Sequence, residues 1–190
     1  MLNIVIFGPP GAGKGTHSIR ITEKYKMMHI STGDIFREKI AKQTPLGMEA
    51  KSYMDQGQLV PDELVVKVLV SVVERNPDVN GFIFDGFPRT INQAQKLDET
   101  LKEKNIPLDL VLSLDVNKEE LINRLVKRGI DSGRSDDTFE VINHRIQVYE
   151  NQTQPLLEYY QKQNKIETVH GIGSIDDIFA DICKVIDKHI

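Results

Sequence analysis

The sequence predicts an α/β fold of three layers, in which helices cover both faces of a five-stranded parallel sheet. Short apolar runs that are typical of buried strands alternate along the chain with segments of helical period. The strand-like runs are 2–7, 28–30, 82–85, 110–115 and 166–170. Helical segments between successive strands indicate that the strands pair in parallel.

The helical segments are expected at 14–25, 32–42, 45–56, 62–76, 90–104, 118–128, 138–163 and 175–188. Three of them fall between the second and third strands, and the two extra segments, 32–42 and 45–56, are interpreted as an insert. Thr44 is suited to cap the second of these helices, with Pro45 in its first turn and Gly57 after its end. Pro155 should kink or divide the long segment 138–163, because proline cannot donate the helical hydrogen bond.

Composition narrows the class of protein. The chain has 190 residues, which fits one domain, and its net charge of −4 argues against a protein that binds nucleic-acid backbone. No apolar run could span a bilayer and no signal-peptide pattern precedes the first strand, so no membrane partner and a cytoplasmic location are expected. Cys183 is the only cysteine and the histidines lack ligand spacing, so we expect no structural zinc.

The segment 8–16, Gly-Pro-Pro-Gly-Ala-Gly-Lys-Gly-Thr, lies between the first predicted strand and the first predicted helix, as a phosphate-binding loop requires. Its glycines allow backbone N–H groups to converge on phosphate oxygens, and the helix dipole adds positive potential. Lys14 is placed to reach the outer phosphates. The general pattern has Ser or Thr directly after the lysine, whereas here Gly15 stands there and Thr16 follows.

Arginines are concentrated in stretches that we interpret as facing phosphate. Arginine offers a planar fork that binds phosphate oxygens in pairs, whereas lysine is a point charge. Arg124 and Arg128 lie four residues apart on one predicted helix, where like charges repel unless an anion lies between them. Six of the eight arginines belong to these stretches: Arg37, Arg89, Arg124, Arg128, Arg134 and Arg145.

The loop has the form G-x-P-G-x-G-K-G-T, with the threonine one place later than in the general pattern. In this form it resembles the loop of the adenylate kinase family. Further segments typical of that family follow in order over almost the whole chain. They are Ser31-Thr32-Gly33-Asp34 with Arg37, the segment 57–60, Asp85-Gly86-Phe87-Pro88-Arg89 with Gln93, Arg124 with Arg128, and Gly133-Arg134-Ser135-Asp136-Asp137 with Arg145.

The resemblance implies the strand order 2-3-1-4-5 of a P-loop fold, and transfer of a phosphoryl group from Mg-bound ATP to AMP by a monomer. It implies catalytic roles for Lys14, Asp85, Arg89, Arg124, Arg134 and Arg145, with Asp85 orienting Mg²⁺ through water. It implies ATP binding by Gly11, Ala12, Gly13, Lys14, Gly15, Thr16, Arg128 and Gly173. It implies AMP binding by Thr32, Arg37, Gln58, Leu59, Val60, Gly86, Phe87, Pro88, Arg89, Gln93, Arg134 and Arg145.

Two covers are expected to exclude water, because water in the site would hydrolyse ATP. The resemblance implies that residues 31–60 form the AMP-binding insert. Residues 127–137 form a short lid, for which Gly129 and Gly133 are candidate hinges. We interpret Asp137 with Glu140 as a capping box for the next helix, which leaves Asp136 to pair with a lid arginine.

Two other functions are weighed against this one. A UMP/CMP kinase shares the loop, the Asp85–Arg89 stretch and the short lid, but Thr32, Thr90 and Gln93 are similar to the adenylate kinase versions of the monophosphate pocket. A non-catalytic GTP-binding switch usually reads guanine with Asn-Lys-x-Asp, and the two nearest strings, beginning at Asn117 and Asn164, lack the aspartate.

Overall fold

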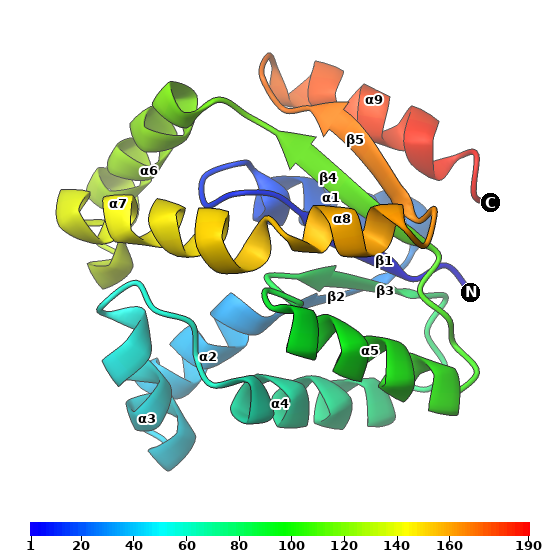
Figure 1. Ribbon diagram of the computed structural model, residues 1–190, viewed down its shortest axis with the longest axis horizontal. Coiled ribbons are helices and arrows are strands. Elements are labelled where there is room, and N and C mark those ends of the chain that lie inside the picture. The colour runs from blue at the N-terminus through cyan, green and yellow to red at the C-terminus, as the bar shows by residue number, and fades with distance from the viewer.

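The computed structural model describes residues 1–190, with the side chain of Ser135 excepted. A parallel sheet of five strands runs through the molecule in the order β2-β3-β1-β4-β5 (Figure 1). Parallel pairing and strand order are thus confirmed. The strands are β1 (Ile4–Phe7), β2 (Met28–Ser31), β3 (Phe82–Asp85), β4 (Leu110–Asp115) and β5 (Ile166–His170).

The strands in the middle of the sheet are buried on both faces, which explains their unbroken apolar runs. Towards one face, Val5 and Phe84 pack against α4 (Asp62–Glu74), α5 (Ile91–Glu103) and α8 (Leu156–Gln161). Towards the other face, Ile6 and Ile83 pack against α1 (Lys14–Tyr25) and α9 (Ile175–Ile186). Alternate residues of each strand therefore serve two separate cores.

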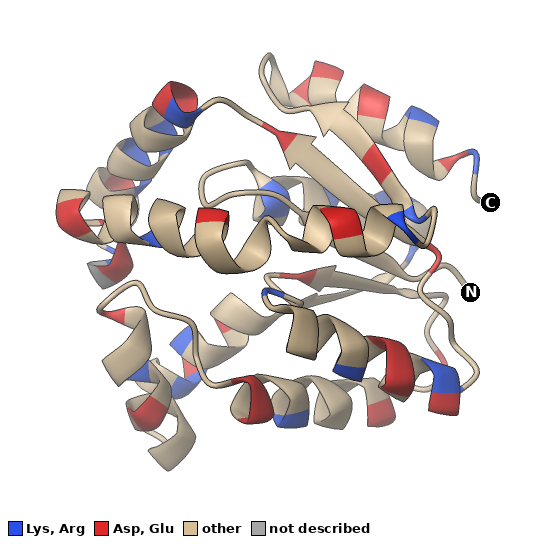
Figure 2. Ribbon diagram, viewed as in Figure 1, with Lys and Arg blue, Asp and Glu red and all other residues tan. Residues whose placement is uncertain are grey.

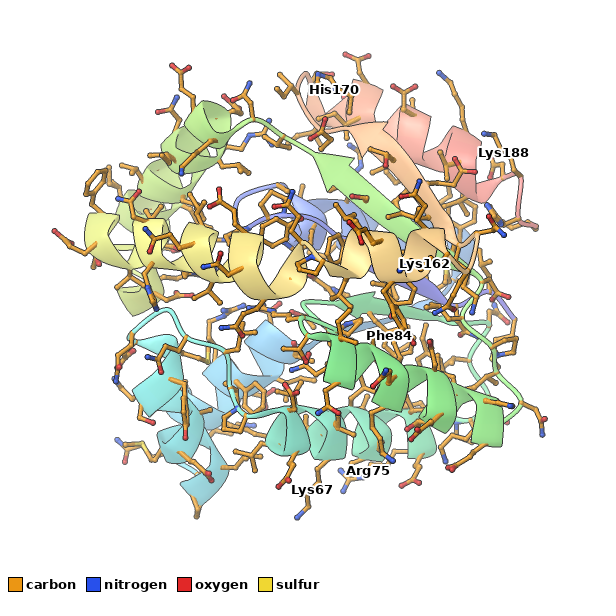
Figure 3. All side chains as sticks on the ribbon, viewed as in Figure 1. Lys67, Arg75, Phe84, Lys162, His170 and Lys188 are labelled. Atoms are coloured by element: carbon orange, nitrogen blue, oxygen red, sulfur yellow. The ribbon has the colours of Figure 1, made fainter. Side chains whose placement is uncertain are left out.

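The side chains follow this layering (Figure 3). Phe84 is completely buried among the residues that pack between the sheet and the helices α4, α5 and α8. Lys67 and Arg75 project away from the molecule on the outer face of α4. Among the described residues, none of the helices combines the length and the apolar character that a membrane crossing requires.

The insert between β2 and β3 contains α2 (Thr32–Ala41) and α3 (Pro45–Met54), as predicted. The Thr44 hydroxyl accepts a hydrogen bond from Gly47 N at 3.0 Å, and Pro45 occupies the first turn of α3. The predicted cap is therefore confirmed. In Figure 1 these helices lie on the same side of the molecule as α6 (Lys118–Ser132) and α7 (Phe139–Val148).

The C-terminal half differs from the prediction in two places. Helix α6 continues to Ser132, so Gly129 lies inside it and not at its end. The segment 138–163 is not one helix: a π-helical turn, η2 (Tyr149–Thr153), separates α7 from α8 just before Pro155. Pro155 therefore divides the segment as predicted, and the wider π-turn accommodates the missing N–H group.

Candidate active site

A cleft opens at the carboxyl edge of the sheet, between the two helix pairs. Its walls come from the phosphate loop, α2, the end of β3, α6 and α7. Acidic residues lie along the helices around the sheet, as Figure 2 shows for α4, α5, α8 and α9, and Asp34, Asp85 and Asp136 line the cleft itself. The cleft brings together all six arginines that the sequence analysis singled out: Arg37, Arg89, Arg124, Arg128, Arg134 and Arg145.

The phosphate loop is held in a conformation that its glycines permit. Gly13, directly before α1, has a φ of 92°, which favours glycine. A Cβ atom on Gly8 would stand 2.9 Å from the Leu114 carbonyl oxygen, so the loop could not pass this close to β4 with a larger residue. Ala12 N donates to Pro9 O at 3.1 Å, which closes the loop as a tight turn.

Lys14 lies half-buried at the floor of the cleft. Its ammonium group donates to the carbonyl oxygens of Gly8 at 2.8 Å and Pro9 at 2.9 Å. Burial lowers the pKa of Lys14 to about 7, because a charged amine loses solvation there; Asp85 opposes this shift and three neighbouring arginines add to it. Those arginines are Arg89, Arg145 and Arg128.

Arg89 is a second half-buried cation that has no carboxylate in direct contact. Its Nε atom donates to Gly86 O at 2.8 Å. Burial, followed by the charge of Arg145, lowers its pKa to about 10. Among the described side chains, neither Lys14 nor Arg89 has a carboxylate oxygen within 4.0 Å. The floor of the cleft therefore carries positive charge that the surrounding protein does not neutralise.

Arg128 and Arg145 are paired with acidic side chains. Arg128 binds Asp137 through two hydrogen bonds of 2.6 and 2.8 Å, and Arg145 Nη1 donates to the same carboxylate at 2.6 Å. Arg145 also lies 3.1 Å from Asp136. Burial alone would raise the pKa of Asp137, but the hydrogen bonds and charge of Arg128, with Arg145 adding to them, lower it.

The predicted capping role of Asp137 is wrong. The cap of α7 is Thr138, whose hydroxyl accepts from Val141 N at 3.4 Å. A side chain between two guanidinium groups gains more from two charge-assisted contacts than from one backbone N–H. Asp137 is accordingly the main partner of the lid arginine Arg128, and Asp136 is the minor partner of Arg145.

The remaining arginines also have acidic neighbours. Arg124 pairs with Glu120 at 2.7 Å and donates to Gly171 O at 3.0 Å, so the expected repulsion between Arg124 and Arg128 is relieved by two separate carboxylates. Arg37 contacts Asp34 at 2.5 Å. Arg134 lies 3.9 Å from the same Asp34 oxygen, and this ion pair links the segment after α6 to helix α2 across the cleft.

A narrower pocket continues from the cleft between α2, the segment 57–60 and α4. Its apolar walls include Phe36, Met54 and Val65. Gln93 lines it although only 1% of its surface is exposed. The Gln93 amide donates to Asp62 at 2.7 Å and accepts from Arg89 N at 2.7 Å, so it already has two protein partners.

Asp85 ends β3 inside the cleft, where it is 8% exposed. His29 Nε2 lies 3.4 Å from its carboxylate, and a Cβ on Gly15 would lie 3.6 Å from it. Among the described residues there is no group of three or more His, Cys, Asp or Glu side chains that could hold a metal ion. Asp85 with Thr16, which also lines the cleft, is the kind of sparse oxygen set that suits Mg²⁺, an ion that keeps most of its waters.

Of the predicted site residues, all but Ala12 and Gly173 line the cleft or its pocket. Ala12 is buried, with its N–H bonded inside the loop. Gly173 belongs to the loop between β5 and α9 and has no heavy atom of another segment within 4 Å of the position of a Cβ. The sequence analysis missed three residues that contact the predicted ones: His29, Asp34 as a link between the covers, and Asp62.

The comparisons with known proteins agree with this geometry. A sequence model of one family, described as adenylate kinase, matches residues 6–165. A protein of Bacteroides thetaiotaomicron named adenylate kinase is 53% identical over 188 residues, which cover 99% of this chain and 100% of that protein. One of Bacteroides fragilis with the same name is 55% identical over 98% of this chain and 99% of its own length. One of Clostridium botulinum, again named adenylate kinase, is 41% identical over 98% of this chain and all of its own.

Proposed function

The chain belongs to the adenylate kinase family, and we propose that it transfers a phosphoryl group reversibly from MgATP to AMP, giving two molecules of ADP. The observation that carries this proposal is the convergence of Lys14 and six arginines on one cleft beside a phosphate loop. A cell would use this reaction to balance its adenine nucleotides.

The charge of the cleft suits two nucleotides whose phosphates face each other. Each terminal phosphate carries roughly −1.5 to −2 charge at neutral pH, so two of them in one cleft need concentrated positive charge. Lys14 and Arg89 offer such charge without a carboxylate partner. A phosphate close to Lys14 would raise its pKa again and restore its full charge.

The roles follow from position. We assign the ATP phosphates to the backbone amides of Gly11 and of residues 13–16 and to Lys14 and Arg128, with the AMP phosphate on Arg37 and Arg89. Arg134 and Arg145 approach the group in transfer, and Arg124 supports the wall through Gly171. Catalysis consists of alignment and charge neutralisation, and no general base is needed.

Asp85 and Thr16 would hold Mg²⁺, Asp85 through water. The ion would supply positive charge to the phosphate oxygens during transfer. Burial of the Asp85 carboxylate beside Lys14 keeps it directed into the cleft. Its contact with His29 would help to orient the carboxylate.

Residues 31–60 and 127–137 are the proposed covers. The ion pair between Asp34 and Arg134 supports this assignment, because it joins one cover to the other above the phosphate loop. Contact of this kind would exclude water while the phosphates are aligned. The family resemblance further supports a monomer that acts in the cytoplasm.

The test is a coupled assay that offers ATP and Mg²⁺ with AMP, CMP, UMP or GMP in turn. We expect rapid ADP formation with AMP alone. Rapid turnover with CMP or UMP but not with AMP would favour a pyrimidine monophosphate kinase of the same fold. Nucleotide binding without turnover of any of the four would contradict the enzymatic proposal.

A further inference from the structure

We propose that Asp62 is a positioning residue that holds the Gln93 amide in one orientation, and that this orientation makes the monophosphate pocket reject bases with a carbonyl where adenine has its amine. The inference rests on the proposed function, because it takes Gln93 as the residue that contacts the base of AMP. It adds a residue outside the predicted site and a cause for base selectivity.

Asp62 is the first residue of α4, and three side chains from the start of α5 converge on its carboxylate. The Thr90 hydroxyl donates to it at 3.0 Å and the Asn92 amide at 2.9 Å, both on Oδ2. Gln93 Nε2 donates to the other oxygen, Oδ1, at 2.7 Å. The carboxylate is thus held from two sides while it contacts Gln93.

The other end of the Gln93 amide is held as well. Its Oε1 atom accepts from the backbone N–H of Arg89 at 2.7 Å. If the amide turned by half a rotation, the NH₂ group of Gln93 would face the Arg89 N–H and its carbonyl would face the Asp62 carboxylate. Both contacts would then be repulsive, because an N–H only donates and a carboxylate only accepts.

An amide has two N–H donors and two acceptor lone pairs, so these contacts leave one of each. Their positions are fixed by the partners on the far side. Adenine presents an amine beside a ring nitrogen that accepts, which matches the free lone pair and the free N–H. Hypoxanthine and guanine present a carbonyl beside a ring N–H, which in the same pose sets acceptor against acceptor and donor against donor.

The surroundings of Gln93 make such a mismatch costly. The side chain is 1% exposed, and the pocket around it is built largely from apolar side chains, among them Phe36, Met54 and Val60. Water has little access to satisfy a wrongly paired amide, and an unpaired buried polar group is expensive. A freely turning amide would accept either base pattern, so the selectivity depends on the partners that prevent the turn.

The experiment compares kcat/KM for AMP and inosine monophosphate in the full-length protein and in Asp62→Asn. The variant keeps the size of the side chain but can turn an NH₂ group toward a rotated Gln93 carbonyl, while the Arg89 N–H still opposes the turn. One of the two constraints on the Gln93 amide is then removed. We expect the ratio of kcat/KM for inosine monophosphate to kcat/KM for AMP to rise by about tenfold. The change should appear in KM, while kcat for AMP stays nearly unchanged.

Cytosine and uracil provide a second arm. Cytosine shares adenine's amine-beside-acceptor pattern, whereas uracil has the carbonyl-beside-donor pattern of hypoxanthine. Asp62→Asn should therefore raise activity with UMP relative to CMP. A merely structural role for Asp62 would lower activity with all four substrates together and leave both ratios where they were.

Asn92→Ala is the matched control, because the Asn92 side chain binds the same carboxylate but is exposed and forms no hydrogen bond with the Gln93 amide. Its ratios should equal those of the unchanged protein. If Asp62→Asn does not fold, the ratios are measured on Asp62→Ser, which also removes the carboxylate. Unchanged ratios in the folded variant overturn the inference.

Gln93→Leu separates this inference from the function on which it rests. If Gln93→Leu raises KM for AMP while Asp62→Asn leaves the ratios unchanged, Gln93 contacts the base and only the role of Asp62 is wrong. If Gln93→Leu leaves KM for AMP unchanged, the base-contacting assignment itself fails.

Discussion

Two pairs of cations line the same cleft and are held in opposite ways. Lys14 and Arg89, at its floor, bond only to backbone carbonyls within the described protein, and burial lowers the pKa of both. Arg128 and Arg145, in the wall formed by α6 and α7, share the fully buried Asp137 carboxylate. The charges of the floor are kept available for a ligand, whereas those of the wall are already stabilised in the folded protein.

The two pairs of cations are therefore expected to serve different purposes, one pair ligand binding and the other the stability of the fold. A buried cation without a carboxylate costs folding energy, which a bound phosphate can offset. A buried cation that shares a carboxylate supports the local fold instead. Substitutions in the floor should therefore affect activity most, and substitutions in the wall should affect the free energy of unfolding.

The largest effect is expected for Lys14→Met. Loss of the Lys14 ammonium group should lower kcat by about 10³-fold or more. The free energy of unfolding should change much less, because Lys14 contacts backbone carbonyls and no carboxylate. Steady-state kinetics and thermal melting measure the two quantities. Lys24→Met, on the exposed face of α1, is the control and should keep full activity. A loss of less than tenfold for Lys14→Met would place the reacting phosphates elsewhere.

Asp137→Asn tests the wall. It leaves Arg128 and Arg145 without their shared carboxylate, and we expect the free energy of unfolding to fall by about 2–3 kcal/mol, less than for a fully buried pair because Arg128 is partly exposed. Chemical denaturation measures the change. Asp136→Asn should cost less, since Arg145 keeps its contact with Asp137. Equal losses in the two variants would contradict the central role of Asp137.

The same carboxylate predicts a dependence of stability on acidity. The folded-state pKa of Asp137 lies below its ordinary value of 3.8. Its contribution is therefore fully present above that value and is lost as pH falls through the lowered pKa. The unfolding midpoint in denaturant should decline less steeply in acid for Asp137→Asn than for the unchanged protein. Parallel acid profiles would show that Asp137 does not contribute.

The lowered pKa of Lys14 predicts that the affinity for ATP depends on pH above neutrality. Free Lys14 titrates near pH 7, and bound phosphate raises its pKa, so above pH 7 each ATP that binds must also bring a proton to the amine. The affinity for ATP should then fall with rising pH, approaching about tenfold per unit. Calorimetry at pH 8.5 in two buffers of different ionisation enthalpy measures the proton uptake. An affinity that is flat between pH 7 and 9 would mean that Lys14 is charged throughout.

The smallest effect concerns the lid glycines. Gly133 ends α6 with a φ of 61° and would meet nothing within 4 Å, so Gly133→Ala should cost only the backbone strain, about 1 kcal/mol. A Cβ on Gly129 would stand 2.7 Å from the Asp137 carbonyl, so Gly129→Ala should shift the wall and cost more. If Gly133 is a hinge, its variant should also change turnover. Turnover unchanged in Gly133→Ala would remove that role.

Features that depend on neighbours in sequence could be predicted. The loop at 8–16 requires particular backbone angles within a few residues. Thr44 accepts a hydrogen bond from the N–H group three residues later, and Pro155 removes one helical hydrogen bond. The parallel pairing of the strands followed from the alternation of strands and helices. Each of these rests on local geometry, which the order of residues determines.

Choices between competing partners could not be predicted. Asp137 could cap α7 or pair with Arg128 and Arg145, and both readings fit its neighbours in sequence. The packing of α7 against α6 decided which partner Asp137 has, because this packing placed two guanidinium groups beside its carboxylate. Asp62 lies 31 residues from Gln93, so no local pattern joins them.

By itself the sequence determined the strand and helix order, the phosphate loop, the family, and nearly every residue of the cleft. Only the tertiary structure decided which arginines are neutralised by the protein, how the Gln93 amide is oriented, and that Asp34 on α2 pairs with Arg134 after α6. The physical reason is the distance along the chain between the residues that interact. Backbone angles and hydrogen-bond capacity belong to single residues, whereas the pairing of charges and amides depends on which segments the folded chain brings within 3 to 4 Å of each other.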